Sequence, residues 1–242
     1  MKNEEIKENF LLKKKINDIG RWYVNRFVIN VSKNTKIKKK LLDAGAGECA
    51  YKPLFKHLEY KSIDLGVGDD EWNYDFLDYK GELHNMPIPN DEFDYVLCTQ
   101  VLEHLELPFE SLKDLNRVLK PGGEIFISVP FCQNEHQEPY DFFRYTSYGL
   151  KSLLSRSGFK DIVVKPFGGR FMRWAWEAPR ILSHLPKIKT KKNKFGIKSI
   201  FTIPIYLISL MIVRIFQLIM MYLDKFDKIK DDTLGWECHA VK

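Results

Sequence analysis

Cysteine is scarce in this sequence, and its few copies are scattered. Four of the 242 residues are cysteine, at positions 49, 98, 132 and 238, and no two of them form a Cys-x-x-Cys pair. We therefore expect neither a disulfide framework nor a metal site. The first eight residues carry charges where a secretion signal has an apolar core. These absences together predict a reducing, cytoplasmic location.

A strong excess of charge of one sign is also missing. The 38 lysines and arginines outnumber the 32 aspartates and glutamates by only six, which gives a formal charge of +6. Several lysines gather in two clusters, at 36–40 and 187–198, instead of spreading over a whole surface. This balance is too mild to indicate a nucleic-acid partner by itself.

Apolar residues are plentiful enough for one sizeable core. Hydrophobic residues make up 45% of the chain and aromatic residues 14%, which argues against disorder. Helical spacing of apolar residues predicts a leader at 1–35. We expect a core domain formed by 36–169 together with 233–242, and a basic and apolar helical insertion at 170–232.

Strand-like and helix-like segments alternate within the core domain. The predicted strands are 41–43, 60–65, 93–99, 124–129, 161–166 and 234–241, and the predicted helices are 109–119 and 147–157. Lys120-Pro121-Gly122-Gly123 is expected to end the first of these helices and turn the chain into the next strand. Such alternation is typical of an α/β fold with a mostly parallel sheet and crossover helices.

A glycine turn follows the first predicted strand, and with a later aspartate it predicts a binding site for a nucleoside. Asp43-Ala44-Gly45-Ala46-Gly47 lets the backbone approach a ligand closely. Asp64 ends the second predicted strand, about twenty residues on, where a carboxylate can accept hydrogen bonds from ribose hydroxyls. Together these two features predict a nucleoside cofactor in a Rossmann-like sheet.

The charge of Asp43 favours one nucleoside cofactor over another. Gly45-x-Gly47-x-x-Ala50 also satisfies the dinucleotide pattern, so NAD remains an alternative. However, a carboxylate two residues before Gly45 would repel a pyrophosphate. S-adenosylmethionine has no phosphate and carries an ammonium and a sulfonium, which a carboxylate attracts. We therefore expect S-adenosylmethionine.

The order and spacing of the motifs resemble a known family. The chain is similar to class I S-adenosylmethionine-dependent methyltransferases, in the type 11-like branch, over roughly residues 38–169 with the last predicted strand. The matching segments are Leu41-Leu42-Asp43-Ala44-Gly45-Ala46-Gly47, Ser62-Ile63-Asp64, 81–88, Phe93-Asp94-Tyr95-Val96, Val101-Leu102-Glu103-His104-Leu105 and 117–123. The resemblance implies a Rossmann-like, doubly wound sheet that is mostly parallel with an antiparallel last strand.

The same resemblance assigns the cofactor contacts. Asp43 with the backbone of Gly45 and Gly47 would hold the methionine end, and Asp64 the ribose. Glu82 and Leu83 would flank the adenine, and Gln100 would follow the predicted strand 93–99 near the methyl group. Two positions depart from the family, because Glu82 stands where aspartate is commoner and Cys49 where a third glycine is common.

His104 lies after the predicted strand 93–99, whose carboxyl end faces the reacting methyl group. A general base contributes about 10²–10⁴-fold where a hydroxyl must lose its proton. His104 is therefore a candidate catalytic base, and the alternative is a histidine that only shapes the site.

A polar loop after the predicted strand 124–129 carries further candidates. His136 is assigned a catalytic role, and Asp141, Arg144 and Tyr145 are assigned to substrate binding, because loops on a rigid scaffold commonly carry such groups. The alternative is that Asp141 and Arg144 only pair with each other while Thr146 caps the next helix. The segment resembles methyltransferases that are found among the enzymes of bacterial surface glycans and lipid-linked saccharides.

A long apolar run lies in the predicted insertion. Residues 199–223 contain Arg214 as their sole charge and follow six lysines at 187–198. This arrangement favours a helix lying on an anionic membrane surface, at the inner face of the cell membrane. Two alternatives stay open: a helix that packs on the protein or makes a homodimer contact, and a true membrane span.

These observations predict an enzyme that moves a methyl group to a hydroxyl, or with less support to an amine or carboxylate. The expected acceptor is a small, glycan-type or lipid-linked molecule at the cytoplasmic membrane face. An NAD-dependent oxidoreductase and a non-catalytic, membrane-tethered module are the alternatives. A nucleic-acid substrate is not expected, because Cys98-Thr99-Gln100 stands where base-amino methyltransferases carry Asp/Asn-Pro-Pro-Tyr.

Overall fold

The computed structural model describes residues 16–68, 72–182 and 197–242 of the chain. Residues 1–15 of the predicted helical leader (1–35) and the second lysine cluster, apart from Lys198, lie outside these ranges. The chain divides into two compact units, one formed by Met1–Phe167 with Gly235–Lys242 and the other by Gly168–Leu234.

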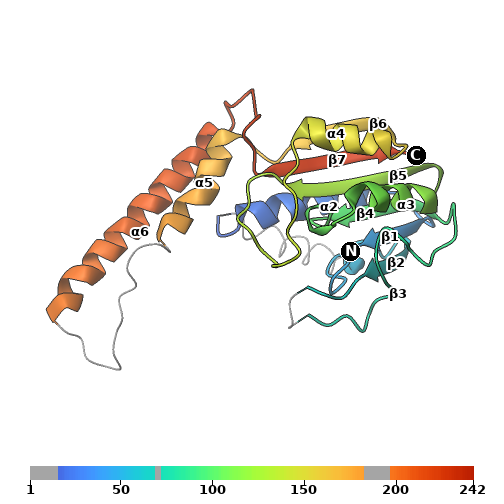
Figure 1. Ribbon diagram of the computed structural model, residues 1–242. Coiled ribbons are helices and arrows are strands. Elements are labelled where there is room, and N and C mark those ends of the chain that lie inside the picture. The colour runs from blue at the N-terminus through green and yellow to red at the C-terminus, as the bar shows by residue number, and fades with distance from the viewer. Residues whose placement is uncertain (1–15, 69–71, 183–196) are drawn as a thin grey trace. The chain divides into compact units, whose positions relative to one another are not determined.

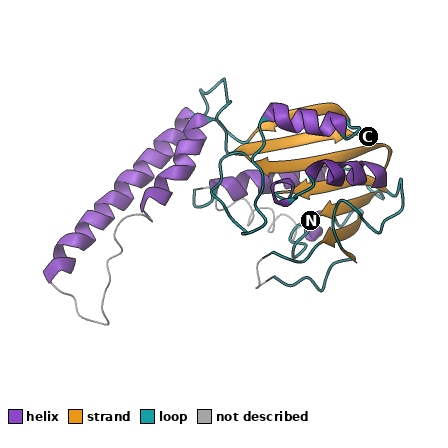
Figure 2. Ribbon diagram, viewed as in Figure 1, coloured by secondary structure: helices purple, strands orange, loops and turns teal. Residues whose placement is uncertain are grey.

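The first unit is built on a seven-stranded sheet in the order β3-β2-β1-β4-β5-β7-β6. Its strands are β1 (Lys40–Ala44), β2 (Glu59–Asp64), β3 (Tyr79–Lys80), β4 (Phe93–Thr99), β5 (Leu119–Pro130), β6 (Lys160–Pro166) and β7 (Gly235–Val241). All neighbouring pairs are parallel except the two that involve β7, which runs antiparallel to β5 and β6. Figure 2 shows these strands side by side. The predicted α/β fold class is confirmed.

Helices cover both faces of this sheet (Figure 1). Helix α2 (Ile19–Asn34) lies on one face, and α3 (Pro108–Val118) with α4 (Ser147–Arg156) lies on the other. Leucines of α3 and α4 join the central strands in the main apolar core. Because both faces are covered, β1 and β4 are buried along almost their whole length, as parallel strands usually are.

Local capping explains where two of these helices begin. The Asp18 carboxylate accepts a hydrogen bond from the backbone N–H of Arg21 at 2.9 Å, at the start of α2. The Thr146 hydroxyl accepts one from Gly149 N–H at 3.0 Å, at the start of α4. Both side chains satisfy a donor that the first helical turn cannot pair.

The strand pattern differs from the sequence expectation at two places. The two-residue strand β3 was not predicted, because so short a segment has no readable alternation. The turn expected at Lys120-Pro121-Gly122-Gly123 lies inside β5 as an irregularity, with Gly122 at φ +75°. Leu119 already pairs with Phe93, so the strand begins before the turn and resumes at Glu124.

The second unit contains α5 (Arg170–Ile181) and α6 (Ile197–Leu223), which pack against each other. The Asp224 carboxylate accepts hydrogen bonds from the N–H groups of Gly169 at 2.8 Å and Met172 at 3.1 Å. The end of α6 thereby caps the start of α5, where unpaired N–H groups favour a carboxylate.

Helix α6 buries a polar side chain and exposes apolar ones. Gln217 is buried and pairs with Arg214 at 2.7 Å. The exposed apolar residues include Ile208, Met211, Ile212, Ile215, Phe216, Leu218 and Ile219. In the described part of the chain, Tyr206–Leu223 is the one segment long and apolar enough to cross a membrane by length and composition.

Candidate functional site

The glycine turn after β1 adopts a backbone that needs glycine. Gly45 and Gly47 have φ values of +78° and +51°. A Cβ atom on Gly45 would collide with the side chain of Val101, which follows β4. The N–H of Gly45 donates to the Ile63 carbonyl at 2.9 Å. The turn is therefore held against β2, and its two glycines let the backbone pack closely against the side chains of Val101 and Trp72.

Asp64 lies at the end of β2 with its carboxylate fixed by backbone donors. One oxygen accepts a hydrogen bond from Gly47 N–H at 2.9 Å and the other from Gly66 N–H at 2.8 Å. Each carboxylate oxygen has a second lone pair, so both can still accept a hydroxyl proton. Two adjacent hydroxyls, such as those of a ribose, match this pair of acceptors.

Asp43 is the most buried carboxyl of this turn. One oxygen accepts a hydrogen bond from the Tyr60 hydroxyl at 2.5 Å, while Oδ1 has no partner among the described residues. Burial raises the pKa of Asp43 from 3.8 to about 7, although the Tyr60 hydrogen bond acts against this rise. A buried acceptor without a partner is costly. A cationic ligand would supply the missing partner.

The remaining predicted cofactor residues lie beside the same edge of the sheet. Leu83 is buried in the core, whereas the Glu82 side chain is about half exposed and its carboxylate lies 3.0 Å from His84 Nε2. Gln100 follows β4 with φ +56°, and its side-chain amide donates to the Ser128 hydroxyl at 3.2 Å. The carboxyl ends of β1, β2 and β4 therefore bring Asp43, Asp64 and Gln100 to one edge.

A short helical turn, η2 (Leu102–His104), places a second group of ionisable side chains after β4. His104 Nδ1 lies 2.5 Å from the Tyr140 carbonyl, which can only accept, so Nδ1 carries the proton. Its Nε2 lies 3.8 Å from a Glu103 oxygen. Burial lowers the pKa of His104 and keeps this ring neutral.

Glu103 is a site residue that sequence reasoning missed. Its side chain is fully buried, and neither carboxyl oxygen has a hydrogen-bond partner among the described residues. Burial raises the pKa of Glu103 to about 8, although the nearby charge of Arg144 lowers it. The available signal was the Leu102-Glu103-His104-Leu105 segment, in which only His104 received a role.

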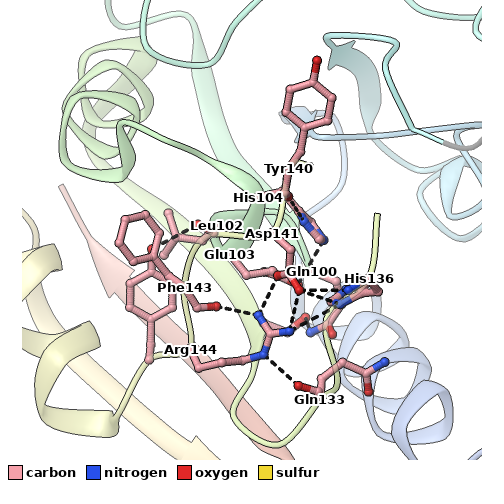
Figure 3. Close-up of polar contacts among 12 residues, drawn as sticks. Gln100, Leu102, Glu103, His104, Gln133, His136, Tyr140, Asp141, Phe143 and Arg144 are labelled. Atoms are coloured by element: carbon pink, nitrogen blue, oxygen red, sulfur yellow. Dashed lines mark hydrogen bonds and ion pairs between the residues drawn. The ribbon is translucent and has the colours of Figure 1, made fainter. Parts of the chain in front are cut away.

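The loop between β5 and α4 folds over η2, and Figure 3 shows its polar contacts. Arg144 binds both oxygens of Asp141, at 2.6 and 2.8 Å, and donates to the Gln133 and Asn134 carbonyls. The Arg144 hydrogen bonds hold the pKa of Asp141 down to about 2. Asp141 and Arg144 thus pair with each other, as the structural alternative expected.

His136 and Tyr145 take different places in this loop. The His136 ring meets the His104 ring edge to face, with centroids 4.8 Å apart. The buried Tyr145 instead donates its hydroxyl to the Leu102 carbonyl at 3.0 Å and accepts the Trp236 indole N–H on its own carbonyl at 2.9 Å. The structure therefore brings together His104 and His136, and ties Tyr145 to the protein backbone.

Part of the chain matches a known protein family. Residues 42–127 match the family model described as "Methyltransferase domain". A tRNA U34 carboxymethyltransferase of Campylobacter fetus is 34% identical over 116 residues, which cover 42% of this chain and 40% of that protein. A demethylmenaquinone methyltransferase of Staphylococcus carnosus is 27% identical over 120 residues, covering 37% and 50%. The chain thus spans half or less of these curated relatives.

Solved structures show the same fold at low identity. A methyltransferase of Archaeoglobus fulgidus described as S-adenosylmethionine-dependent matches with a TM-score of 0.56 and 18% identity, over 96% of this chain and 99% of that one. Phosphoethanolamine N-methyltransferase 2 of Haemonchus contortus, solved with S-adenosylmethionine, matches with a TM-score of 0.54 and 18% identity, over 91% and 52%. At this identity the likeness establishes the fold.

Proposed function

We propose that this chain methylates a hydroxyl of a small, glycan-type or lipid-linked acceptor at the cytoplasmic membrane face. The chain is a member of the class I S-adenosylmethionine-dependent methyltransferase family. An amine or carboxylate acceptor has less support. The neighbours named above are methyltransferases, which leaves the oxidoreductase alternative without support.

The unpartnered oxygen of Asp43 is the observation that carries the cofactor assignment. Asp43 is buried and its Oδ1 lacks a hydrogen bond among the described residues. The ammonium or sulfonium of S-adenosylmethionine would satisfy it, whereas a pyrophosphate would add like charge beside a buried carboxylate. The Asp64 carboxylate, oriented by Gly47 and Gly66, suits the ribose hydroxyls. The donor set therefore fits this cofactor.

The residues of the chain would act by binding and orientation first. When bound, S-adenosylmethionine supplies a methyl group already activated by its sulfonium. Gly45 and Gly47 let the backbone approach, and Asp43 and Asp64 hold the two ends of the ligand. Alignment of an acceptor oxygen, the methyl carbon and the sulfur is the largest gain available to such an enzyme.

The acceptor hydroxyl must also lose its proton, and the two histidines are the groups suited to this. The Nδ1 atom of His104 donates to the Tyr140 carbonyl, so its lone pair is on Nε2. His136 Nδ1 lies 3.0 Å from the Asn134 carbonyl and 3.4 Å from Arg144 Nη2, and in the tautomer that donates to this carbonyl the lone pair of His136 is also on Nε2. We assign the loss of the hydroxyl proton to this histidine pair.

The apolar face of α6 supports the membrane part of the proposal. Residues such as Ile212, Ile215 and Ile219 are exposed although the helix buries Gln217. An exposed face of this composition suits the boundary between lipid headgroups and acyl chains. The lysines at 187–198 precede it in the sequence and would attract anionic lipid.

A ligand screen by thermal shift tests the function. S-adenosylmethionine and S-adenosylhomocysteine should raise the unfolding temperature by mass action, and NAD should not. A radiolabelled methyl group from S-adenosylmethionine should then appear on lipid-linked saccharides or on quinols when these are supplied with the full chain. Stabilisation by NAD alone would overturn the proposal.

A further inference from the structure

Three side chains around η2 form a set, of which only the two histidines have a predicted role. One ligand atom each from Glu103, His104 and His136 lies within 4.8 Å of the others. Glu103 is fully buried, and the two histidines are partly exposed. The sequence separates His136 from the other two by more than thirty positions, so only the loop between β5 and α4 brings it here.

Both imidazoles are oriented as metal ligands usually are. A ligating histidine commonly donates its second ring N–H to a backbone carbonyl or a carboxylate, which fixes the tautomer. His104 Nδ1 has the Tyr140 carbonyl at 2.5 Å. His136 Nδ1 has the Asn134 carbonyl at 3.0 Å, an Asp141 oxygen at 3.3 Å and the Arg144 guanidinium at 3.4 Å. His104 therefore keeps an unprotonated Nε2, and His136 does so in the tautomer whose Nδ1 donates to the Asn134 carbonyl or to Asp141.

Glu103 supplies the independent sign of a missing partner. A buried carboxyl normally has hydrogen-bond donors on its oxygens, and both oxygens of Glu103 lack them among the described residues. The His104 Nε2, the nearest basic atom by ion-pair geometry, is 3.8 Å from Oε1, beyond hydrogen-bond distance. A cation between these atoms would satisfy the carboxylate and the lone pair of the ring together.

We propose that Glu103, His104 and His136 bind a divalent first-row transition-metal ion of the Zn²⁺ type. Two imidazoles and one carboxylate suit Zn²⁺, Fe²⁺ or Co²⁺ and leave a coordination position open, whereas Mg²⁺ prefers oxygen ligands and water. Ligand atoms on a tetrahedral ion with bonds of about 2.0–2.1 Å lie roughly 3.4 Å apart. The observed limit of 4.8 Å requires them to close by about an ångström or somewhat more.

The neighbouring charges are compatible with such an ion. The Arg144 guanidinium lies 3.4 Å from His136 Nδ1, and Asp141 neutralises its charge through two hydrogen bonds of 2.6 and 2.8 Å. An ionised Glu103 then leaves one net negative charge for the ion. The ion would lower the pKa of an acceptor hydroxyl beside it, so the inference deepens the proposed function by naming how the histidine pair acts. That role rests on the proposed function, while the binding itself does not.

Metal titration of the full chain tests the binding. After removal of metals with a chelator, the protein should bind one equivalent of Zn²⁺ by calorimetry, and one equivalent of Co²⁺ with visible absorption bands of a nitrogen and oxygen site. Glu103→Gln and His136→Ala should each weaken Zn²⁺ binding by at least about tenfold. His239→Ala is the matched control, because His239 contacts Glu124 at 2.6 Å without a third ligating side chain among the described residues.

The affinity for S-adenosylmethionine distinguishes the loss of the metal site from misfolding of a variant and from failure of the proposed function. Glu103→Gln and His136→Ala should keep it, which shows that the variants fold. The absence of Zn²⁺ binding by the wild type, or equal binding by the wild type and both ligand variants, would overturn the metal site. Zn²⁺ binding in a chain that takes up no S-adenosylmethionine would keep the site and remove the proposed function.

Discussion

Binding of S-adenosylmethionine should depend on pH through Asp43. Burial raises the pKa of this carboxyl from 3.8 to about 7 in the unliganded protein. A shift of about 3 pKa units, at about 1.4 kcal/mol each, makes ionising Asp43 about 4 kcal/mol more costly than in water. A cation placed beside Asp43 favours its ionised form. Below pH 7, binding must therefore also release a proton.

Calorimetry of S-adenosylmethionine binding across the pH range measures this linkage. We expect the affinity to rise about tenfold per pH unit between pH 5 and 7 and to level off above. Asp43→Asn should bind at least about tenfold more weakly at pH 7.5 and lose the slope. Asp91→Asn is the matched control, because Asp91 forms an exposed ion pair with Lys242. A wild-type affinity that does not change with pH would refute the reasoning.

The same pKa shift predicts how the stability of the unliganded protein varies with pH. The folded protein keeps the Asp43 proton up to about pH 7, whereas the unfolded chain releases it near pH 3.8. The contribution of Asp43 to the free energy of unfolding therefore falls as the pH rises through this window. Asp43→Asn should stabilise the unliganded protein by about 2 kcal/mol more at pH 8 than at pH 5.5, as measured by urea unfolding.

Three further outcomes follow from the site and from α6. Asp64→Ala should abolish calorimetrically detectable S-adenosylmethionine binding, because it removes both ribose acceptors, and unchanged affinity would contradict that role. Arg144→Ala should lower the free energy of unfolding by about 3 kcal/mol, since it removes the guanidinium that binds both oxygens of the Asp141 carboxylate, whose side chain is 4% exposed. Urea unfolding measures this, and turnover should fall while cofactor affinity survives. The full chain should sediment with anionic liposomes less at high salt, whereas indifference to lipid would favour a packed α6.

Local patterns in the sequence were sufficient to predict the residues assigned to the cofactor. The glycine turn, its preceding Asp43 and the later Asp64 all lie at strand ends, and parallel strands bring their carboxyl ends to one edge of a sheet. Alternating segments predicted the strands and the two crossover helices within a few residues, because buried parallel strands and amphipathic helices differ in period. The two-residue strand β3 was too short for that signal.

Only the tertiary structure decided what the residues after β4 and β5 do. The sequence shows His104 and His136 far apart along the chain, and only the folded loop between β5 and α4 places their ring centroids 4.8 Å apart. The folded loop leaves the Glu103 carboxyl buried beside His104 without a hydrogen-bond partner among the described residues. The Tyr145 hydroxyl donates to a backbone carbonyl, and Arg144 pairs with Asp141. Residues distant in sequence meet through packing, and no local period records which of them will share a buried volume.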